Sequence, residues 1–167
     1  MKKILFIASV TFLFSTATFS QTKFDIPQNV KLETPADFET YENDVVNAAT
    51  WLEETDLDKD KVKRREVNTF VLQWLTGSPT VTVELSEPLI KLYDKNEQLL
   101  GLYLASYAKY NILNKTNTSK FEATKAAIVS MIKVYKKGID IVKNKEMEKA
   151  VKLFDQGKID DYIKSKL

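Results

Sequence analysis

The sequence predicts an all-α protein, a single-domain bundle of about six helices arranged in antiparallel hairpins. Glycine and proline number only four each among 167 residues, so few positions interrupt a helix. Apolar residues recur every three or four positions along most of the chain, which gives each segment one side to bury. The period-two alternation of a half-buried strand is convincing only in residues 80–85.

Residues 1–20 are predicted to form a signal peptide that is cleaved during export. Lys2 and Lys3 provide a positive start, residues 4–14 form an apolar core, and small residues precede a cleavage point between Ser20 and Gln21. The apolar run is well short of the roughly 20 residues that span a bilayer, so we expect no stable membrane anchor. The mature protein is therefore expected in the periplasm or outside the cell.

The mature chain is expected to open with an extended segment, residues 21–33, followed by a helical domain, residues 34–167. The first helix should begin at Thr34 and Pro35, because threonine caps free amide groups and proline fits the first turn. Asp37 follows three residues after the cap. The apolar stripe of this helix comprises Phe38, Tyr41, Val45, Ala48 or Ala49, and Leu52.

A second helix should follow the polar interruption at residues 56–60. Gly77, with Pro79 after it, is expected to end this helix in a left-handed turn. The short link between the first two helices predicts an antiparallel hairpin. The expected buried face of the second helix comprises Val67, Phe70, Val71, Trp74 and Leu75.

Residues 80–85 allow three interpretations, in order of preference. The first is a stretched loop across the bundle with Val81, Val83 and Leu85 turned inward. The second is a two-stranded ribbon with residues 29–33, and the third is an open edge that accepts a strand from a partner.

The second half of the chain is expected to supply the centre of the bundle. Ser86 begins a helical stretch that bends or restarts near Asn96. Residues 99–113 are the most apolar of the mature chain and mix large with small side chains, which suits a central helix contacted on several sides. Three further helices are expected: one from Ser119 to Gly138, one closed by Gly157, and a short last one from Ile159 to Leu167.

Two segments, FVLQWLTGSPTVTVEL at residues 70–85 and LLGLYLASYAKY at residues 99–110, resemble small exported proteins of Bacteroidota. A signal that ends just before glutamine is also similar to exports from that group. The resemblance covers about half of the mature chain. It implies a helical periplasmic or secreted domain and brings no activity, cofactor or catalytic residue with it.

Composition excludes several kinds of chemistry. The chain has no cysteine and no histidine, so disulfides, thiolate nucleophiles and the commonest general base are absent. No glycine-rich phosphate loop is present, and no cofactor is expected. The net charge of +2 comes from Lys2 and Lys3, so the mature chain is formally neutral and nucleic acid is not an expected partner.

The charges are unevenly distributed along this neutral chain. Residues 21–58 carry two lysines against ten acidic residues, whereas residues 109–167 carry fourteen lysines against seven. The favoured interpretation is that the two regions partly neutralise each other within one fold. The alternative is that each presents a one-signed surface to a partner or to a second copy, and a monomer or weak homodimer is expected.

A basic cluster, formed by Lys61, Lys63, Arg64 and Arg65, is the first candidate binding patch. Cations near a helix N-terminus face an unfavourable dipole, so something must offset them. The offset could come from an anionic ligand such as a phosphate or acidic glycan, or from a protein partner. The favoured source is local, namely the acids of residues 56–60 and of the first helix.

Aromatic residues offer a second candidate. Trp51 and Trp74, with Tyr103, Tyr107 and Tyr110, could line a groove for a sugar or peptide. At helical spacing such residues more often belong to the core, which is the favoured interpretation.

Other groups of charged or hydroxyl residues are weaker candidates for a functional site. Asp56, Asp58 and Asp60 have the spacing that opens an EF-hand, but Lys61 and Val67 replace the required glycine and glutamate, which favours an acidic helix start. The adjacent acids Glu53–Glu54 and Asp160–Asp161 point in different directions on a helix and form no catalytic dyad. Serine and lysine three residues apart, at Ser106–Lys109 and Ser130–Lys133, suit ordinary helix surface.

These observations predict an exported helical protein, most simply a non-catalytic binding or accessory protein of the cell envelope. The first alternative is a carboxylate-based hydrolase acting on an envelope or extracellular substrate, with its acids brought together from distant segments. The second is a self-associating envelope assembly factor that uses its oppositely charged regions.

Overall fold

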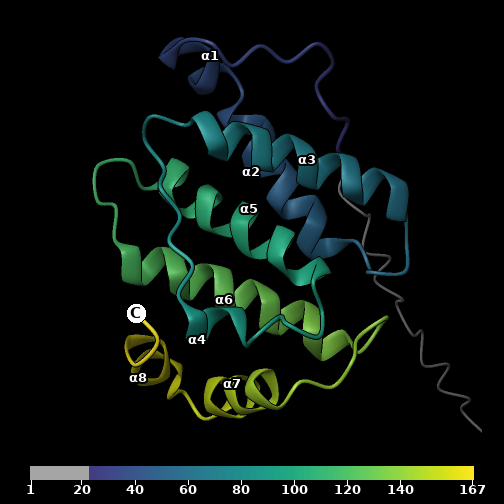
Figure 1. Ribbon diagram of the computed structural model, residues 1–167, viewed down its shortest axis with the longest axis vertical. Helices are drawn as coiled ribbons and strands as arrows, with labels where there is room; N and C mark the ends of the chain where they lie inside the picture. Colours follow the sequence, from purple (N-terminus) through teal and green to yellow (C-terminus); the bar gives the residue numbers. More distant parts are fainter. Residues whose placement is uncertain (1–22) are drawn as a thin grey trace, which may run out of the picture.

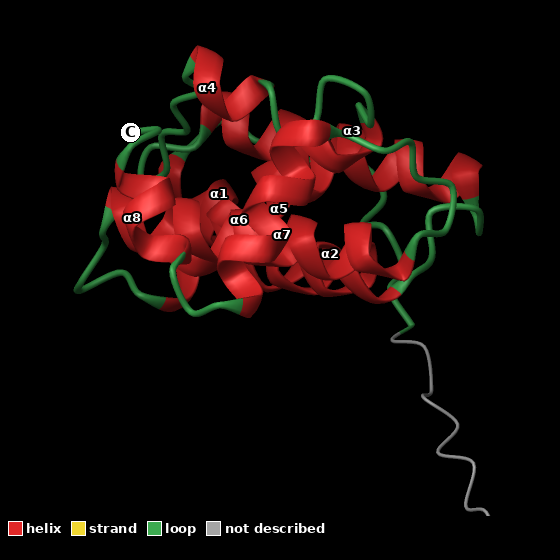
Figure 2. Ribbon diagram, turned by 90° about the horizontal axis from the view of Figure 1, so that it is seen from below, coloured by secondary structure: helices red, strands yellow, loops and turns green. Residues whose placement is uncertain are grey.

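The computed structural model describes residues 23–167, and this part of the chain contains eight α-helices and no strand (Figures 1 and 2). The predicted all-α bundle is therefore confirmed. The predicted signal peptide lies outside the described residues. The helices are α1 (Pro35–Thr40), α2 (Glu42–Glu54), α3 (Lys61–Gly77), α4 (Glu87–Ile90), α5 (Gln98–Leu113), α6 (Lys120–Lys137), α7 (Lys145–Asp155) and α8 (Ile159–Lys164).

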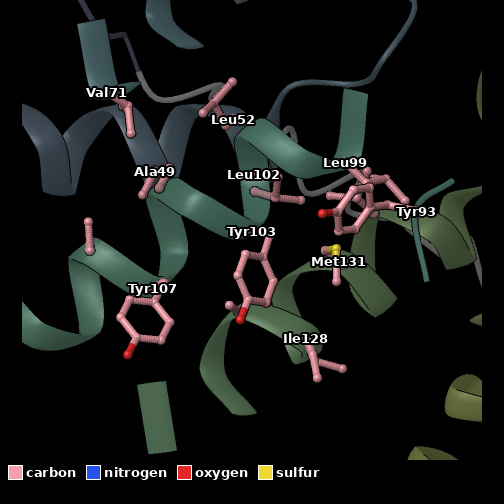
Figure 3. Close-up of a cluster of buried hydrophobic side chains, with 14 of the residues drawn as sticks. Ala49, Leu52, Val71, Tyr93, Leu99, Leu102, Tyr103, Tyr107, Ile128 and Met131 are labelled. Carbon is pink, nitrogen blue, oxygen red and sulfur yellow. The ribbon is translucent and has the colours of Figure 1, made fainter. Parts of the chain in front are cut away.

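Helix α5 lies at the centre, as its composition predicts. It packs against α2, α3 and α6, and α6 in turn contacts α7 and α8 (Figure 1). Figure 3 shows Leu102 and Tyr103 of α5 among core side chains from the neighbouring helices. Gly101 permits the close approach of α3, because a Cβ atom there would collide with the side chain of Asn68.

Tyr103 places a hydroxyl group inside this core. Burial raises the pKa of the Tyr103 hydroxyl to about 12, although the nearby Thr124 hydroxyl acts to lower this pKa to a smaller extent. Among the described residues, no hydrogen bond of good geometry reaches the Tyr103 hydroxyl.

The first helix begins where the sequence predicts but ends earlier. Asp37 Oδ2 accepts hydrogen bonds from the backbone N–H groups of Thr34 (2.7 Å) and Glu33 (3.0 Å), which completes a capping box. The expected single helix is interrupted at Tyr41, which separates α1 from α2. The indole N–H of Trp74 donates to the Phe38 carbonyl (2.9 Å). A carbonyl in the last turn of α1 is therefore bonded to a side chain that is distant in sequence.

Gly77 has a different role from the expected one. It lies within α3 and is not among the residues with positive φ. An added Cβ atom would lie 2.5 Å from Cζ of Phe38, so glycine is required for close packing rather than for a left-handed turn. The expected buried face of α3 is otherwise confirmed, except that Leu75 is only partly buried.

Residues 80–85 form the stretched loop that was the preferred interpretation. Val81 is buried, Val83 is partly buried, and Leu85 is exposed, so the inward orientation holds for two of the three residues. The Ser78 hydroxyl accepts from the backbone N–H of Val81 (3.2 Å), which satisfies one polar group of the loop without a ribbon. Residues 29–33 have no strand pairing with it.

Both ends of α6 and the end of α7 follow the predicted signals, whereas α8 ends at Lys164 rather than at Leu167. Ser119 caps α6 by accepting from the Glu122 backbone N–H (3.3 Å), and Gly138 and Gly157 follow α6 and α7 with φ of 69°. Asn96 is buried and exchanges two hydrogen bonds of 2.8 Å with the Val142 backbone, which ties the link after α6 to the start of α5. None of the described helices is long and apolar enough to cross a membrane.

Candidate functional site

The basic cluster does not form one surface. The Arg64 side chain is buried, with 4% of its residue surface exposed. Its guanidinium donates to the carbonyls of Thr55 (2.6 Å) and Leu52 (3.2 Å), at the C-terminal end of α2. Burial lowers the pKa of Arg64 and the charge of Asp56 raises it. Arg64 thus serves as a structural cap for the preceding helix.

Other cations of this region are also used within the fold. Lys61 pairs with Asp140 (2.8 Å), and Lys63 lies over the Trp51 ring, 5.1 Å from its centroid. Lys137 donates to the Glu53 and Glu54 carbonyls (3.1 and 3.0 Å). The expected offset was from the acids of residues 56–60 and of the first helix; instead, Arg64 meets the carbonyl groups that end α2, where cations are favourable, and Lys61 meets Asp140.

The two tryptophans are core residues. Trp51 is 2% exposed and Trp74 is 0% exposed. Trp51 of α2 lies beside Arg64, near the start of α3, and Trp74 lies near the end of α3, beside Phe38. Neither presents a ring to a surface groove. Lys61, Lys63 and Arg65 remain the part of the predicted patch that is at least partly accessible.

The alternating acids after α2 do not converge. Asp56 pairs with Lys137 (3.2 Å) and Asp58 with Lys59 (3.3 Å), while Asp60 takes a left-handed conformation with φ of 44° just before α3. Within the described part of the chain, no group of three or more acids is arranged to hold a metal ion.

A cleft where α2, α5 and α6 meet gathers polar side chains from all three helices. Its volume is about 370 Å³. Small side chains at the helix contacts leave this space open, and longer ones surround it. The lining residues are Ala49, Glu53, Ser106, Lys109, Tyr110, Leu113, Asn114, Ala126, Val129, Ser130 and Lys133.

A chain of hydrogen bonds crosses the cleft and ends on a carboxylate. Ser106 Oγ donates to Ser130 Oγ (2.9 Å), and Ser130 Oγ donates to Glu53 Oε2 (2.5 Å). The second oxygen of Glu53 accepts from Lys133 Nζ (2.9 Å). Both carboxylate oxygens are therefore occupied, and both serines are buried.

Glu53 is ionised at neutral pH. Burial acts to raise the pKa of its carboxyl group, but the hydrogen bonds from Ser130 and Lys133 and the charges of Lys133 and Lys109 outweigh it. The pKa of Glu53 is consequently lower than its ordinary value.

Lys109, unlike Lys133, is not paired with Glu53. Its Nζ donates to Thr50 Oγ1 (2.7 Å), and it forms no ion pair with any acid of residues 23–167. The sequence placed Ser106–Lys109 and Ser130–Lys133 on ordinary helix surface, so the cleft was missed. The sequence shows that a serine is followed by a lysine three residues later on each of two helices. It does not show that these two helix faces meet.

Comparisons with protein-family models, curated proteins and solved structures found no match. The resemblance to Bacteroidota exports therefore remains a prediction.

Proposed function

We propose that this chain is an exported, non-catalytic binding or accessory protein of the cell envelope, and that its ligand occupies the cleft between α2, α5 and α6. One observation carries the proposal: charged and hydroxyl groups from three helices converge on a hollow of about 370 Å³. Ligand sites typically combine such a concavity with a few converging polar groups.

The state of the polar groups favours binding over hydrolysis. A carboxylate-based hydrolase needs two facing acids, one of them with a raised pKa. Among the described residues, Glu53 is the only acid that lines this cleft, its pKa is lowered, and both of its oxygens accept a hydrogen bond. Ser106 donates to Ser130 and Ser130 donates to Glu53, and both serines are buried, so neither hydroxyl is placed to attack a substrate.

Export is supported by the pattern of residues 1–20 and is tested separately from binding. The full-length chain with a C-terminal tag is expressed in a Gram-negative host, and the intact mass of the fractionated protein is measured. We expect periplasmic or secreted protein that begins at Gln21. Cytoplasmic protein that retains residues 1–20 would contradict the export proposal.

Binding is tested by recording ¹⁵N-labelled spectra of the purified protein with a mixed set of neutral, cationic and anionic fragments. We expect at least some fragments to shift the amide signals of cleft residues such as Tyr110 and Val129. Ala126→Leu narrows the cleft and should weaken those fragments, whereas the control Ala36→Leu on the exposed side of α1 should not. Fragments that shift only other regions would refute the cleft as the binding site.

A further inference from the structure

We infer that the ligand of this cleft carries one carboxylate group, held by Lys109, together with a small apolar part. The inference rests on the proposed function and adds the chemical class of the ligand. It follows from the unused donors of Lys109, the net charge of the lining and the apolar side chains beside it.

Lys109 has donor capacity that the fold does not use. Its ammonium group has three N–H donors. One goes to Thr50 Oγ1 (2.7 Å), whose own hydrogen is donated to the Val46 carbonyl (3.0 Å). The acid in the same cleft, Glu53, is already paired with Lys133. The charge of Lys109 also acts on Glu53, but one carboxylate cannot balance two lysines, so one positive charge is left in a half-buried place where it attracts an anion more strongly than a fully solvated group does.

The charge of the lining limits the charge of the ligand. Lys109, Lys133 and Glu53 are the ionisable acids and bases of the cleft, and together they give a net charge of one positive unit. One negative charge on the ligand balances this total. A dianion such as a phosphate monoester would place a second negative charge near Glu53, where repulsion opposes it. A monocarboxylate therefore fits best.

Apolar side chains adjoin the cationic end of the cleft. Leu113, four residues after Lys109 on α5, is 63% exposed although it lines a concave surface. Tyr110 and Val129 line the same cleft. The volume is near the lower end of the range for ligand pockets, so the apolar part is small. A short free fatty acid and the C-terminal residues of a peptide share this chemistry.

The test is an NMR titration of the purified protein with hexanoate and with N-acetyl-alanyl-leucine, which represent the two sources. Hexanamide and hexylamine are the neutral and cationic controls. We expect both carboxylates to shift the signals of Lys109 and Tyr110, with dissociation constants of about 1–10 mM for such small ligands. Hexanamide should bind at least about fivefold more weakly.

Variants identify the residue that holds the charge. Lys109→Gln should weaken hexanoate by about fivefold or more, while Lys109→Arg retains the charge and should remain within about threefold. The control Lys152→Gln removes an exposed lysine of α7 and should leave binding unchanged. A cooperative thermal melt of each variant, followed by circular dichroism, confirms that it is folded.

Two results would overturn the inference while leaving the proposed function in place. Hexanamide or hexylamine could bind the cleft as tightly as hexanoate, or Lys109→Gln could bind hexanoate as tightly as the unmodified protein. Neutral fragments that shift the cleft while neither carboxylate does would have the same meaning. If no fragment or probe shifts the cleft, both the inference and the proposed function fail.

Discussion

Replacing Arg64 with methionine is expected to cost far more stability than replacing its neighbour Arg65. Methionine keeps an apolar stem near the Trp51 ring but removes the donors to Leu52 O and Thr55 O. The carbonyl groups of Leu52 and Thr55, which are both buried, then lose their charged hydrogen-bond donor. Arg65 is exposed, so the matched Arg65→Met variant removes a similar cation without this loss.

The expected magnitude follows from these two hydrogen bonds. A hydrogen bond to a charged group contributes about 1.5–3 kcal/mol, and the 2.6 Å bond to Thr55 should lie at the upper end of that range. Relief of the buried guanidinium's desolvation offsets part of the loss, so Arg64→Met should lower the free energy of unfolding by about 3 kcal/mol. Arg65→Met should change it by about 0.5 kcal/mol or less.

Urea unfolding followed by tryptophan fluorescence measures both variants. With a denaturant slope of about 2 kcal/mol/M, a loss of about 3 kcal/mol lowers the midpoint by about 1.5 M. Arg64→Lys keeps the charge but not the forked geometry, and it should fall between the other two. Equal midpoints for Arg64→Met and Arg65→Met would refute the assignment of Arg64 as a helix cap.

Three further substitutions test other parts of the structure. Gly77→Ala should destabilise the protein by about 1–2 kcal/mol because the new Cβ meets the Phe38 ring, and adding Phe38→Leu should recover much of that loss in urea unfolding. Tyr103→Phe removes a buried hydroxyl that has no well-formed hydrogen bond, so the free energy of unfolding should stay within about 0.5 kcal/mol or rise slightly. Glu53 has a folded-state pKa below its ordinary 4.5, so its stabilising contribution is present above about pH 4.5 and is lost as the pH falls through the lower value. Glu53→Gln should therefore be less stable at pH 7 but lose less stability than the unmodified protein between pH 5 and pH 3; parallel pH profiles would contradict this.

Local signals in the sequence predicted most of the helix ends. Thr34 with Asp37, Ser119, Gly138 and Gly157 act within one turn of the chain, so short-range patterns were sufficient. The central position of α5 was also predictable, because a helix with large and small apolar residues all round must be covered on several sides.

Features set by distant contacts were not predictable in the same way. The need for glycine at position 77 depends on the Phe38 ring, and the last turn of α1 before the break at Tyr41 has its Phe38 carbonyl bonded to the distant Trp74. Helical spacing tells which residues share a face, but not which other face they meet. The pairing of Glu53 with Ser130, 77 positions away in the sequence, depends on that second kind of information.

The same distinction decides which cations are available for a ligand. The densest basic cluster, around Arg64, suggests a binding patch because its charges are adjacent in sequence. In the fold, however, Arg64 donates to the Thr55 carbonyl and Lys61 pairs with Asp140. Lys109 stands alone in its segment, and within the described residues its ammonium group meets a hydroxyl rather than an acid. Charge that remains unmatched after folding, rather than charge density along the chain, is what a ligand can use. Arg64 and Lys61 do not meet that criterion, whereas Lys109 does, in a cleft that also gathers hydroxyl and apolar side chains.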